Sequence, residues 1–180
     1  MEKETLAKLV EKLNGLDWFI FSGSAIEIYT NGKRLAGDID ILMQKKDIDE
    51  FARRLGCKAG IRHMQKTNFV VEDYGFDAVF EGQEIDVTSG FVKPVSIGRT
   101  KATPMNLQIL FNKKVKMSYK GVELFVVPIE EAIVQKATMH RPKDIKDLKL
   151  LLKEKFDPKF LAEDAKLWGT YNAVKKVLHD

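Results

Sequence analysis

The segment at residues 38–44, which reads DIDILMQ, limits the possible folds more than any other part of the chain. Its mostly apolar composition is typical of a buried strand, and residues two apart in a strand lie on the same face, roughly 6.5 to 7 Å apart along the chain. Asp38 and Asp40 therefore project together, while the isoleucines beside them enter a core. Aspartate is disfavoured in strands, and two like charges repel. The pairing therefore predicts a cation between the two carboxylates.

A glycine-containing turn precedes this strand. The apolar run at residues 16–21 (LDWFIF) predicts another strand, which ends before Gly23-Ser24, and a helix is expected over residues 25–31. A glycine lets an anion approach the backbone, and the first turn of a helix presents free N–H groups to it. Because Ser24 adds a hydroxyl donor, we expect Gly23 and Ser24 to bind an anionic group opposite the aspartates.

A later strand offers a third carboxylate. Asp86 lies between two β-branched apolar residues, whereas the alternative, Asp77, has neighbours that fit a buried strand less well. Magnesium takes hard oxygen ligands, usually one or two carboxylates together with substrate phosphates and water. Asp38, Asp40 and Asp86 are therefore the candidate ligands of Mg²⁺ or Mn²⁺. Asp86 could also act as a general base, by taking a proton from the group that attacks the phosphate.

The Gly-Ser turn after a strand, the short spacer and the two apolar-Asp-apolar strands resemble the DNA polymerase beta-like nucleotidyltransferase superfamily over residues 16–88. The chain is most similar to small stand-alone members, namely the aminoglycoside, minimal and abortive-infection nucleotidyltransferases. The resemblance implies an α/β (α+β) fold with a small mixed β-sheet core flanked by helices. It also implies two-metal transfer of a nucleotide from a nucleoside triphosphate, with ATP favoured, to a hydroxyl or phosphate acceptor, with release of pyrophosphate.

The resemblance extends to about residue 153 through Lys136 and an Arg-x-Lys-Asp-x-x-Asp segment. That segment is made of Arg141, Lys143, Asp144 and Asp147. By analogy Lys136 contacts nucleotide phosphates, while the two aspartates brace the helical part. The alternative for Lys136 is a solvated lysine on an amphipathic helix. The spacer KRLAG lacks the Arg-x-Ser element of many members, which leaves the role of the nearby Arg34 open.

Hydrophobic periodicity predicts alternating helices and strands along the rest of the chain. Further helices are expected at residues 3–14, 47–55, 129–140, 143–155 and 159–178. Further strands are expected at residues 68–72, 76–81, 84–88, 114–119 and 122–127. Asp47 suits the N-cap of its helix, and Gly82-Gln83 and Lys120-Gly121 suit tight hairpin turns. Residues 90–112 are interpreted as loop with one turn or helix.

These elements group into two parts. Residues 1–128 are expected to form the nucleotidyltransferase core, and residues 129–180 a C-terminal helical extension packed on that core. No Gly/Ser-rich linker separates the two parts. We therefore expect the extension to share the core of the sheet.

Composition excludes several other classes of protein. The chain is 44% hydrophobic and 31% charged, which is typical of a folded globular protein. It has no apolar run of membrane-spanning length and no signal-peptide block, so a cytoplasmic protein with no membrane partner is expected. The single cysteine, Cys57, cannot form an internal disulfide. No metal-ligand spacing connects the three histidines, His63, His140 and His179.

Other functions are compatible with the same residues. One is a catalytically silent module that binds a nucleotide or a protein partner, and another is a toxin–antitoxin component, which rests on analogy alone. A metal-dependent phosphohydrolase or nuclease is disfavoured, because it would not need the Gly-Ser turn and more often has histidine ligands. The sequence does not identify the acceptor, which could be a small molecule, an RNA end or a protein, or the oligomeric state.

Overall fold

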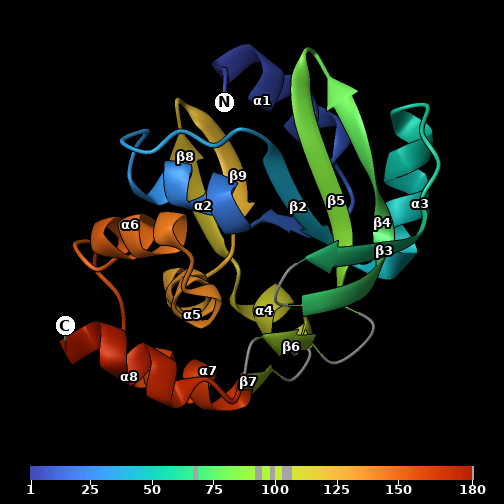
Figure 1. The fold of residues 1–180 in the computed structure, drawn as a ribbon. Coiled ribbons are helices and arrows are strands. Elements are labelled where there is room, and N and C mark those ends of the chain that lie inside the picture. Colours follow the sequence, from blue (N-terminus) through green and yellow to red (C-terminus); the bar gives the residue numbers. More distant parts are fainter. Residues whose placement is uncertain (67–68, 92–94, 98–99, 103–106, 180) are drawn as a thin grey trace.

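A seven-stranded mixed sheet forms the centre of the molecule (Figure 1). The computed structural model describes residues 1–66, 69–91, 95–97, 100–102 and 107–179. The strands of the main sheet are β1 (Trp18–Ile20), β2 (Ile39–Met43), β3 (Gly60–Lys66), β4 (Phe69–Phe80), β5 (Gln83–Phe91), β8 (Val115–Tyr119) and β9 (Val122–Val126). Their order is β3-β4-β5-β2-β1-β9-β8. The predicted α/β fold with a mixed sheet is confirmed.

Strand β2 lies in the middle of this sheet and is buried on both faces. It pairs antiparallel with β1 and parallel with β5, and in the parallel pairing Asp40 is the register partner of Asp86. Ile39 and Ile41 are fully buried on the opposite face from these acids. The alternation predicted for residues 38–44 therefore exists, and it aligns the acids of two neighbouring strands.

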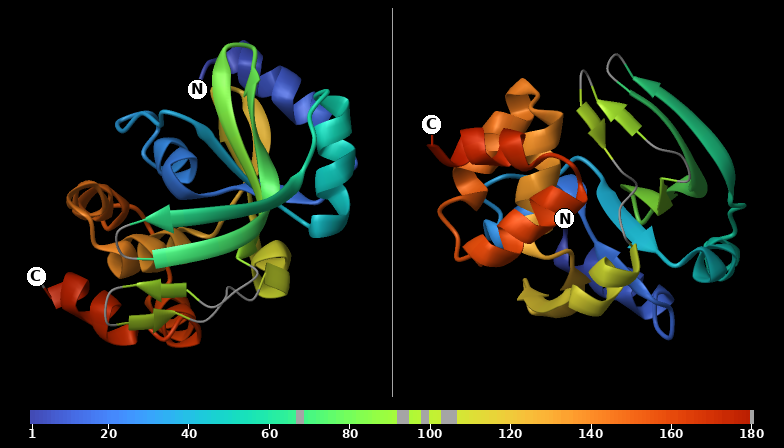
Figure 2. Two further views of the ribbon diagram at one scale, coloured as in Figure 1. Left: turned by 45° about the vertical axis from the view of Figure 1, so that its right-hand side comes forward. Right: turned by 90° about the horizontal axis from the view of Figure 1, so that it is seen from below.

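Helices cover both faces of the sheet (Figure 2). On one face lie α1 (Lys3–Lys12) and α3 (Lys45–Arg54), and on the other lie α2 (Ser22–Tyr29) and α5 (Ile129–Met139). Beyond α5 follow α6 (Pro142–Leu151), α7 (Pro158–Leu167) and α8 (Tyr171–His179). Buried residues of the sheet and of α5–α8 belong to one hydrophobic cluster. Among the described helices, none is both long and apolar enough to span a membrane.

The two predicted hairpins are present. Lys120 and Gly121 have φ of 52° and 79°, and Glu81 and Gly82 have φ of 51° and 78°. Positive φ at both central residues is typical of a type I′ turn, whose twist matches that of the flanking strands. The turn after β4 is therefore Glu81-Gly82, one residue earlier than predicted, because Gln83 already pairs with Phe80.

The edge of the sheet next to β5 differs from the prediction. The strands expected at 68–72 and 76–81 form one strand, β4, with an irregularity between Asp73 and Gly75; residue 68 lies outside the described residues. Strand β3 was not predicted, because its sequence, GIRHMQK, is polar and lacks a continuous apolar face. Such a composition is tolerated at a sheet edge, where burial is incomplete.

Three other predicted elements are corrected. Helix α3 begins at Lys45 with Gln44 at its N-cap, and the Asp47 carboxylate instead accepts the Asp17 N–H at 3.1 Å. The single helix expected at 159–178 is divided into α7 and α8 at Gly169, whose φ is 68°. In residues 90–112 the expected turn or helix is present as α4 (Leu107–Lys113), but part of the expected loop is a small second sheet of β6 (Val95–Ile97) and β7 (Thr100–Ala102). Residues 92–94, 98–99 and 103–106 of this region lie outside the described residues.

Gly75 lies in a part of the sheet that leaves no space for a side chain. A Cβ there would lie 2.0 Å from the Val87 carbonyl oxygen, whereas a Cβ at Gly37 would meet nothing within 4 Å. We expect G75A to lower the free energy of unfolding by about 3 kcal/mol or more, because backbone atoms must move. G37A should change it by less than about 0.5 kcal/mol. Urea unfolding of both variants tests this, and equal stabilities would contradict it.

Candidate active site

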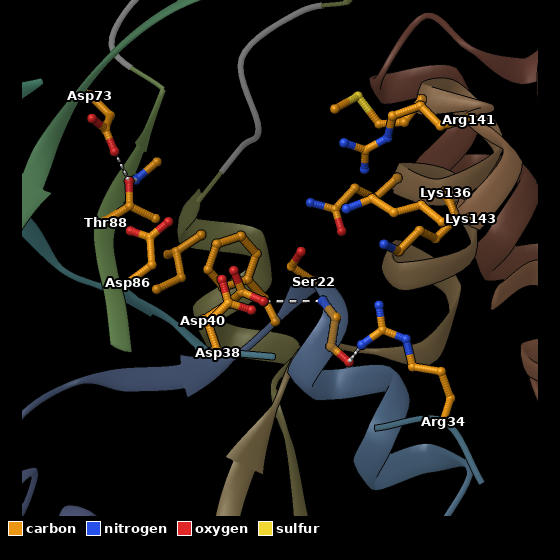
Figure 3. A pocket seen from close by; sticks show the side chains of 16 residues that line it. Ser22, Arg34, Asp38, Asp40, Asp73, Asp86, Thr88, Lys136, Arg141 and Lys143 are labelled. Atoms are coloured by element: carbon orange, nitrogen blue, oxygen red, sulfur yellow. Dashed lines mark hydrogen bonds between the residues drawn. The ribbon is translucent and has the colours of Figure 1, made fainter. Parts of the chain in front are cut away.

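A cleft of about 220 Å³ lies between the sheet and the helices α2, α5 and α6. Its two sides carry opposite charge (Figure 3). The sheet side contributes carboxylates, which are Asp38, Asp40, Asp73 and Asp86. The helix side contributes cations, which are Arg34, Lys136, Arg141 and Lys143. The structure therefore brings five of the six predicted site residues, Gly23, Asp38, Asp40, Asp86 and Lys136, to a single cleft.

Ser24 does not line the cleft. It is fully buried, and its hydroxyl accepts the Asp40 N–H at 2.9 Å. The same hydroxyl lies 2.8 Å from the Asp38 carbonyl oxygen and 3.3 Å from Asp40 Oδ2. The Gly23 N–H donates to Asp40 Oδ2 at 3.2 Å. The Gly-Ser turn therefore orients Asp40, and Gly23 is the residue of the pair that an incoming anion could reach.

The Asp40 carboxyl group is buried, with 9% of the residue exposed. Burial raises its pKa, and the charges of Asp38 and Asp86 raise it further, to about 6, against hydrogen bonds from Ser24. A carboxylate in this position is stabilised by a nearby cation, because a cation removes the repulsion between like charges. The donor chemistry of Asp38 and Asp40 therefore fits a hard divalent ion such as Mg²⁺.

The two candidates for the third carboxylate lie in different places. Asp86 is directly beside Asp40 on the neighbouring strand, and its side chain is 31% exposed. Asp77 is one strand further out, its side chain is 74% exposed, and it lines a second groove but not the cleft, whereas Asp86 lines both. Burial raises the pKa of Asp86, although Arg62 opposes this. The geometry thus favours Asp86, in agreement with the choice made from the sequence pattern.

Arg62, which the sequence did not indicate, hydrogen-bonds an acid of the cleft. It extends from β3, and Nη1 donates to Asp86 Oδ1 at 2.9 Å and to Asp77 Oδ1 at 3.1 Å. Its Nε donates to Asp73 Oδ1 at 3.1 Å. Without a predicted β3, nothing in the pattern could direct this arginine toward the acids.

The cations opposite are held by their own counter-charges. Lys136 Nζ is nearly buried and lies 3.2 Å from an oxygen of each of Asp144 and Asp147. Arg141 donates to both oxygens of Asp144, and Arg34 Nε donates to Asp147 Oδ1 at 3.1 Å. The two aspartates thus brace the helical part, as the resemblance implied. They do so by fixing the direction of the cations.

Two further residues face the cleft. Lys143 is exposed, and among the described residues its ammonium group has no ion-pair partner. Ser22, the first residue of α2, has a φ of 53°, a left-handed conformation that is unusual outside glycine. This turn directs its side chain toward the cleft (Figure 3). Lys143 belongs to the segment that carries the resemblance, whereas the position of Ser22 could not be predicted, because it depends on the direction of the backbone.

Within the described part of the chain, no three acidic, His or Cys side chains are arranged to hold a metal ion by themselves. A divalent ion at Asp38 and Asp40 would therefore complete its ligand set with phosphate and water oxygens, which is usual for Mg²⁺. Cys57 is a free thiol away from the cleft, His63 is exposed, and His140 ends α5. The side chain of His179 lies outside the described residues.

No family model matches the chain, and a sequence comparison with curated proteins finds no match. Solved structures match it in fold. A candidate nucleotidyltransferase from Thermotoga maritima is 15% identical over 84% of this chain and 92% of its own, with a TM-score of 0.54. The lincomycin-bound lincosamide antibiotic adenylyltransferase LnuA is 12% identical over 84% and 97%, with a TM-score of 0.53. ANT(2″)-Ia with adenylyl-2″-tobramycin is 16% identical over 96% and 94%, with a TM-score of 0.51. The chain therefore has the nucleotidyltransferase fold.

Asparagine at position 40 should stabilise the metal-free protein in a pH-dependent way. Because the pKa of Asp40 is raised from 3.8 to about 6, the folded chain binds this proton more tightly than the unfolded chain. Ionised Asp40 therefore opposes folding above pH 6 and stops doing so as the pH falls toward 4. D40N should be more stable than the unmodified chain by about 3 kcal/mol at pH 7.5, and by less than about 1 kcal/mol at pH 4.

Urea unfolding in EDTA at pH 4, 6 and 7.5 measures the two differences. A stability difference that is the same at all three pH values would show that the charge of Asp40 is not penalised in the folded state.

Proposed function

We propose that the chain is a metal-dependent nucleotidyltransferase that moves a nucleoside monophosphate from a nucleoside triphosphate to a hydroxyl or phosphate acceptor and releases pyrophosphate. One observation carries the proposal: an acidic wall and a basic wall face each other across one cleft (Figure 3). A triphosphate with a divalent cation is a ligand that satisfies both walls. The nucleotidyltransferase fold supports the same conclusion.

The basic wall would bind the triphosphate. Lys143 and Arg141 are the more accessible cations, whereas Lys136 is held deeper by two aspartates. Charge-assisted hydrogen bonds to phosphate are among the strong interactions of proteins, and the guanidinium group suits them by its geometry. Gly23 lines the cleft and would let the phosphates approach the backbone. Ser24 would act indirectly, by positioning Asp40.

The acidic wall would hold the α-phosphate of the triphosphate and the attacking oxygen of the acceptor. Mg²⁺ or Mn²⁺ bound at Asp38 and Asp40 would neutralise charge on the α-phosphate and on the departing pyrophosphate. An acceptor oxygen would attack the α-phosphorus and form a new P–O bond, while the bond to the β-phosphate bridging oxygen breaks. Asp86 would receive the acceptor proton. Asp38 and Asp86 also line a second groove, together with residues of β4 and β5, from which an acceptor could enter.

ATP and a small hydroxyl-bearing acceptor are the favoured substrates. Two proteins of the same fold are described as a lincosamide antibiotic adenylyltransferase and as a complex with adenylyl-2″-tobramycin. An adenylyl group is common to both descriptions, which supports ATP as donor.

Loss of either metal-binding aspartate should abolish transfer. With [α-³²P]ATP, Mg²⁺ or Mn²⁺ and a panel of small alcohols, RNA and protein acceptors, we expect label on one acceptor class and equimolar pyrophosphate. D38N or D40N should lower the rate at least about 1000-fold, since charge stabilisation in the transition state is lost.

D49N provides the matched control. Asp47 and Asp49 have the same spacing as Asp38 and Asp40, but Asp49 is exposed on α3, away from the cleft. The D49N variant should therefore transfer the nucleotide at the same rate as the unmodified chain. Release of free phosphate without label transfer would indicate a hydrolase. Binding of the triphosphate without turnover on any acceptor would indicate a silent binding module.

Lys143 should contribute to triphosphate affinity, whereas Lys146 should not. Both lysines are exposed on α6, but only Lys143 lines the cleft. K143A is expected to raise the Kd of a Mg²⁺–nucleotide analogue about 10-fold, because one charge-assisted hydrogen bond is lost. K146A should leave it within about 2-fold. Calorimetric titration measures both values, and equal effects would assign the basic wall a structural role.

A further inference from the structure

The side chain of Arg62 crosses a whole strand to reach the acidic wall. It starts on the edge strand β3, passes β4 and meets Asp86 on β5, where Nη1 lies 2.9 Å from Oδ1. The nearest acid on β4, Asp73, is its register partner and accepts hydrogen bonds from Nε and Nη2. The guanidinium group therefore links the candidate third carboxylate to the buried interior of the β3–β4 pair.

Several features of the sheet build this path. Asp73 has a fully buried side chain, and the Thr88 hydroxyl donates to its Oδ2 at 2.6 Å. Gly75 follows the irregularity in β4, and a Cβ there would lie 2.9 Å from Arg62 Nη2. The space that Arg62 uses thus depends on the lack of a side chain at Gly75. With a side chain that is only 16% exposed, Arg62 is a fixed cation and not a freely moving surface group.

This arrangement differs from the two-metal site that the sequence pattern predicts. In that site Asp86 would ligate one of the two ions. In the structure one oxygen of Asp86 already accepts a hydrogen bond from a guanidinium group, which is charged at every accessible pH. A divalent ion bound to Asp86 would lie beside this positive charge, and like charges at such short range repel strongly in a partly buried site.

We infer that Arg62 takes the place of a second divalent cation at Asp86, so that the chain binds one metal ion, at Asp38 and Asp40, with the triphosphate. The inference rests on the proposed function, because it concerns the metal content of that site. In this arrangement Arg62 orients Asp86 as the acceptor of a proton. Asp86 then has no direct metal contact.

The number of bound metal ions tests the inference directly. Electron paramagnetic resonance can count Mn²⁺ bound per complex of the chain with an ATP analogue that has a methylene group between the α- and β-phosphorus atoms. We expect one tightly bound ion in the unmodified chain. R62Q should bind a second ion at least about 10-fold more tightly than the unmodified chain does, and the double variant R62Q/D86N should lose that gain.

Two controls make the result specific. R53Q removes an arginine that pairs with Glu50 on the exposed face of α3, and it should leave the count at one. R62K keeps the positive charge and should also leave the count at one. Urea unfolding identifies variants that unfold because Asp73 has lost its ion-pair partner. The number of ions bound to the unmodified chain is measured without any substitution.

The outcomes separate the two proposals. Two tightly bound ions in the unmodified chain, or a folded R62Q that still binds one, would overturn the role of Arg62 and leave the proposed transferase intact. No tightly bound ion in the presence of the nucleotide analogue would overturn both the role of Arg62 and the metal-dependent reaction itself.

Discussion

Repulsion between carboxylates at the centre of the sheet is the constraint on which the candidate site depends. The parallel pairing of β2 with β5 puts Asp40, in an otherwise apolar strand, directly beside Asp86. An ionised acid is unfavourable there, and burial together with its acidic neighbours raises the pKa of Asp40 to about 6. Hydrogen bonds from Gly23 and Ser24 nevertheless hold the carboxylate in one orientation. A site of this kind is ordered before any cation arrives, which is the condition for binding a metal–phosphate complex without rearrangement.

Positive charge approaches this cluster from two directions, and each approach uses a different part of the fold. Arg62 comes from the edge of the sheet, through the gap at Gly75. The other cations come from the helices on the far side of the cleft, where Asp144 and Asp147 hold Lys136 and its neighbours in place. The helical part therefore forms one side of the cleft, and its buried residues join the core of the sheet.

The sequence pattern predicted much of this arrangement because its signals are local. A strand fixes the direction of alternate side chains, so Asp38 and Asp40 could be paired from their spacing, and the hairpin at Lys120-Gly121 follows from residues that accept positive φ. The predictions that failed concern elements that depend on contacts between distant parts of the chain. Strand β3 has a polar sequence that becomes a strand only because β4 offers it a partner, and the break at Gly169 depends on how α8 packs back on α5.

The local pattern was thus enough to identify Asp38 and Asp40 and the strand that carries them, since a two-residue repeat in an apolar strand has only one side-chain geometry. The position of Asp86, and not of Asp77, beside Asp40 is a property of the folded sheet, because it depends on which strand neighbours β2. Tertiary structure also decided that Ser24 is buried while Ser22 faces the cleft, and that Arg62 reaches Asp86. Strand order and the direction of a side chain across a neighbouring strand arise from the packing of the whole chain, and no local pattern encodes them.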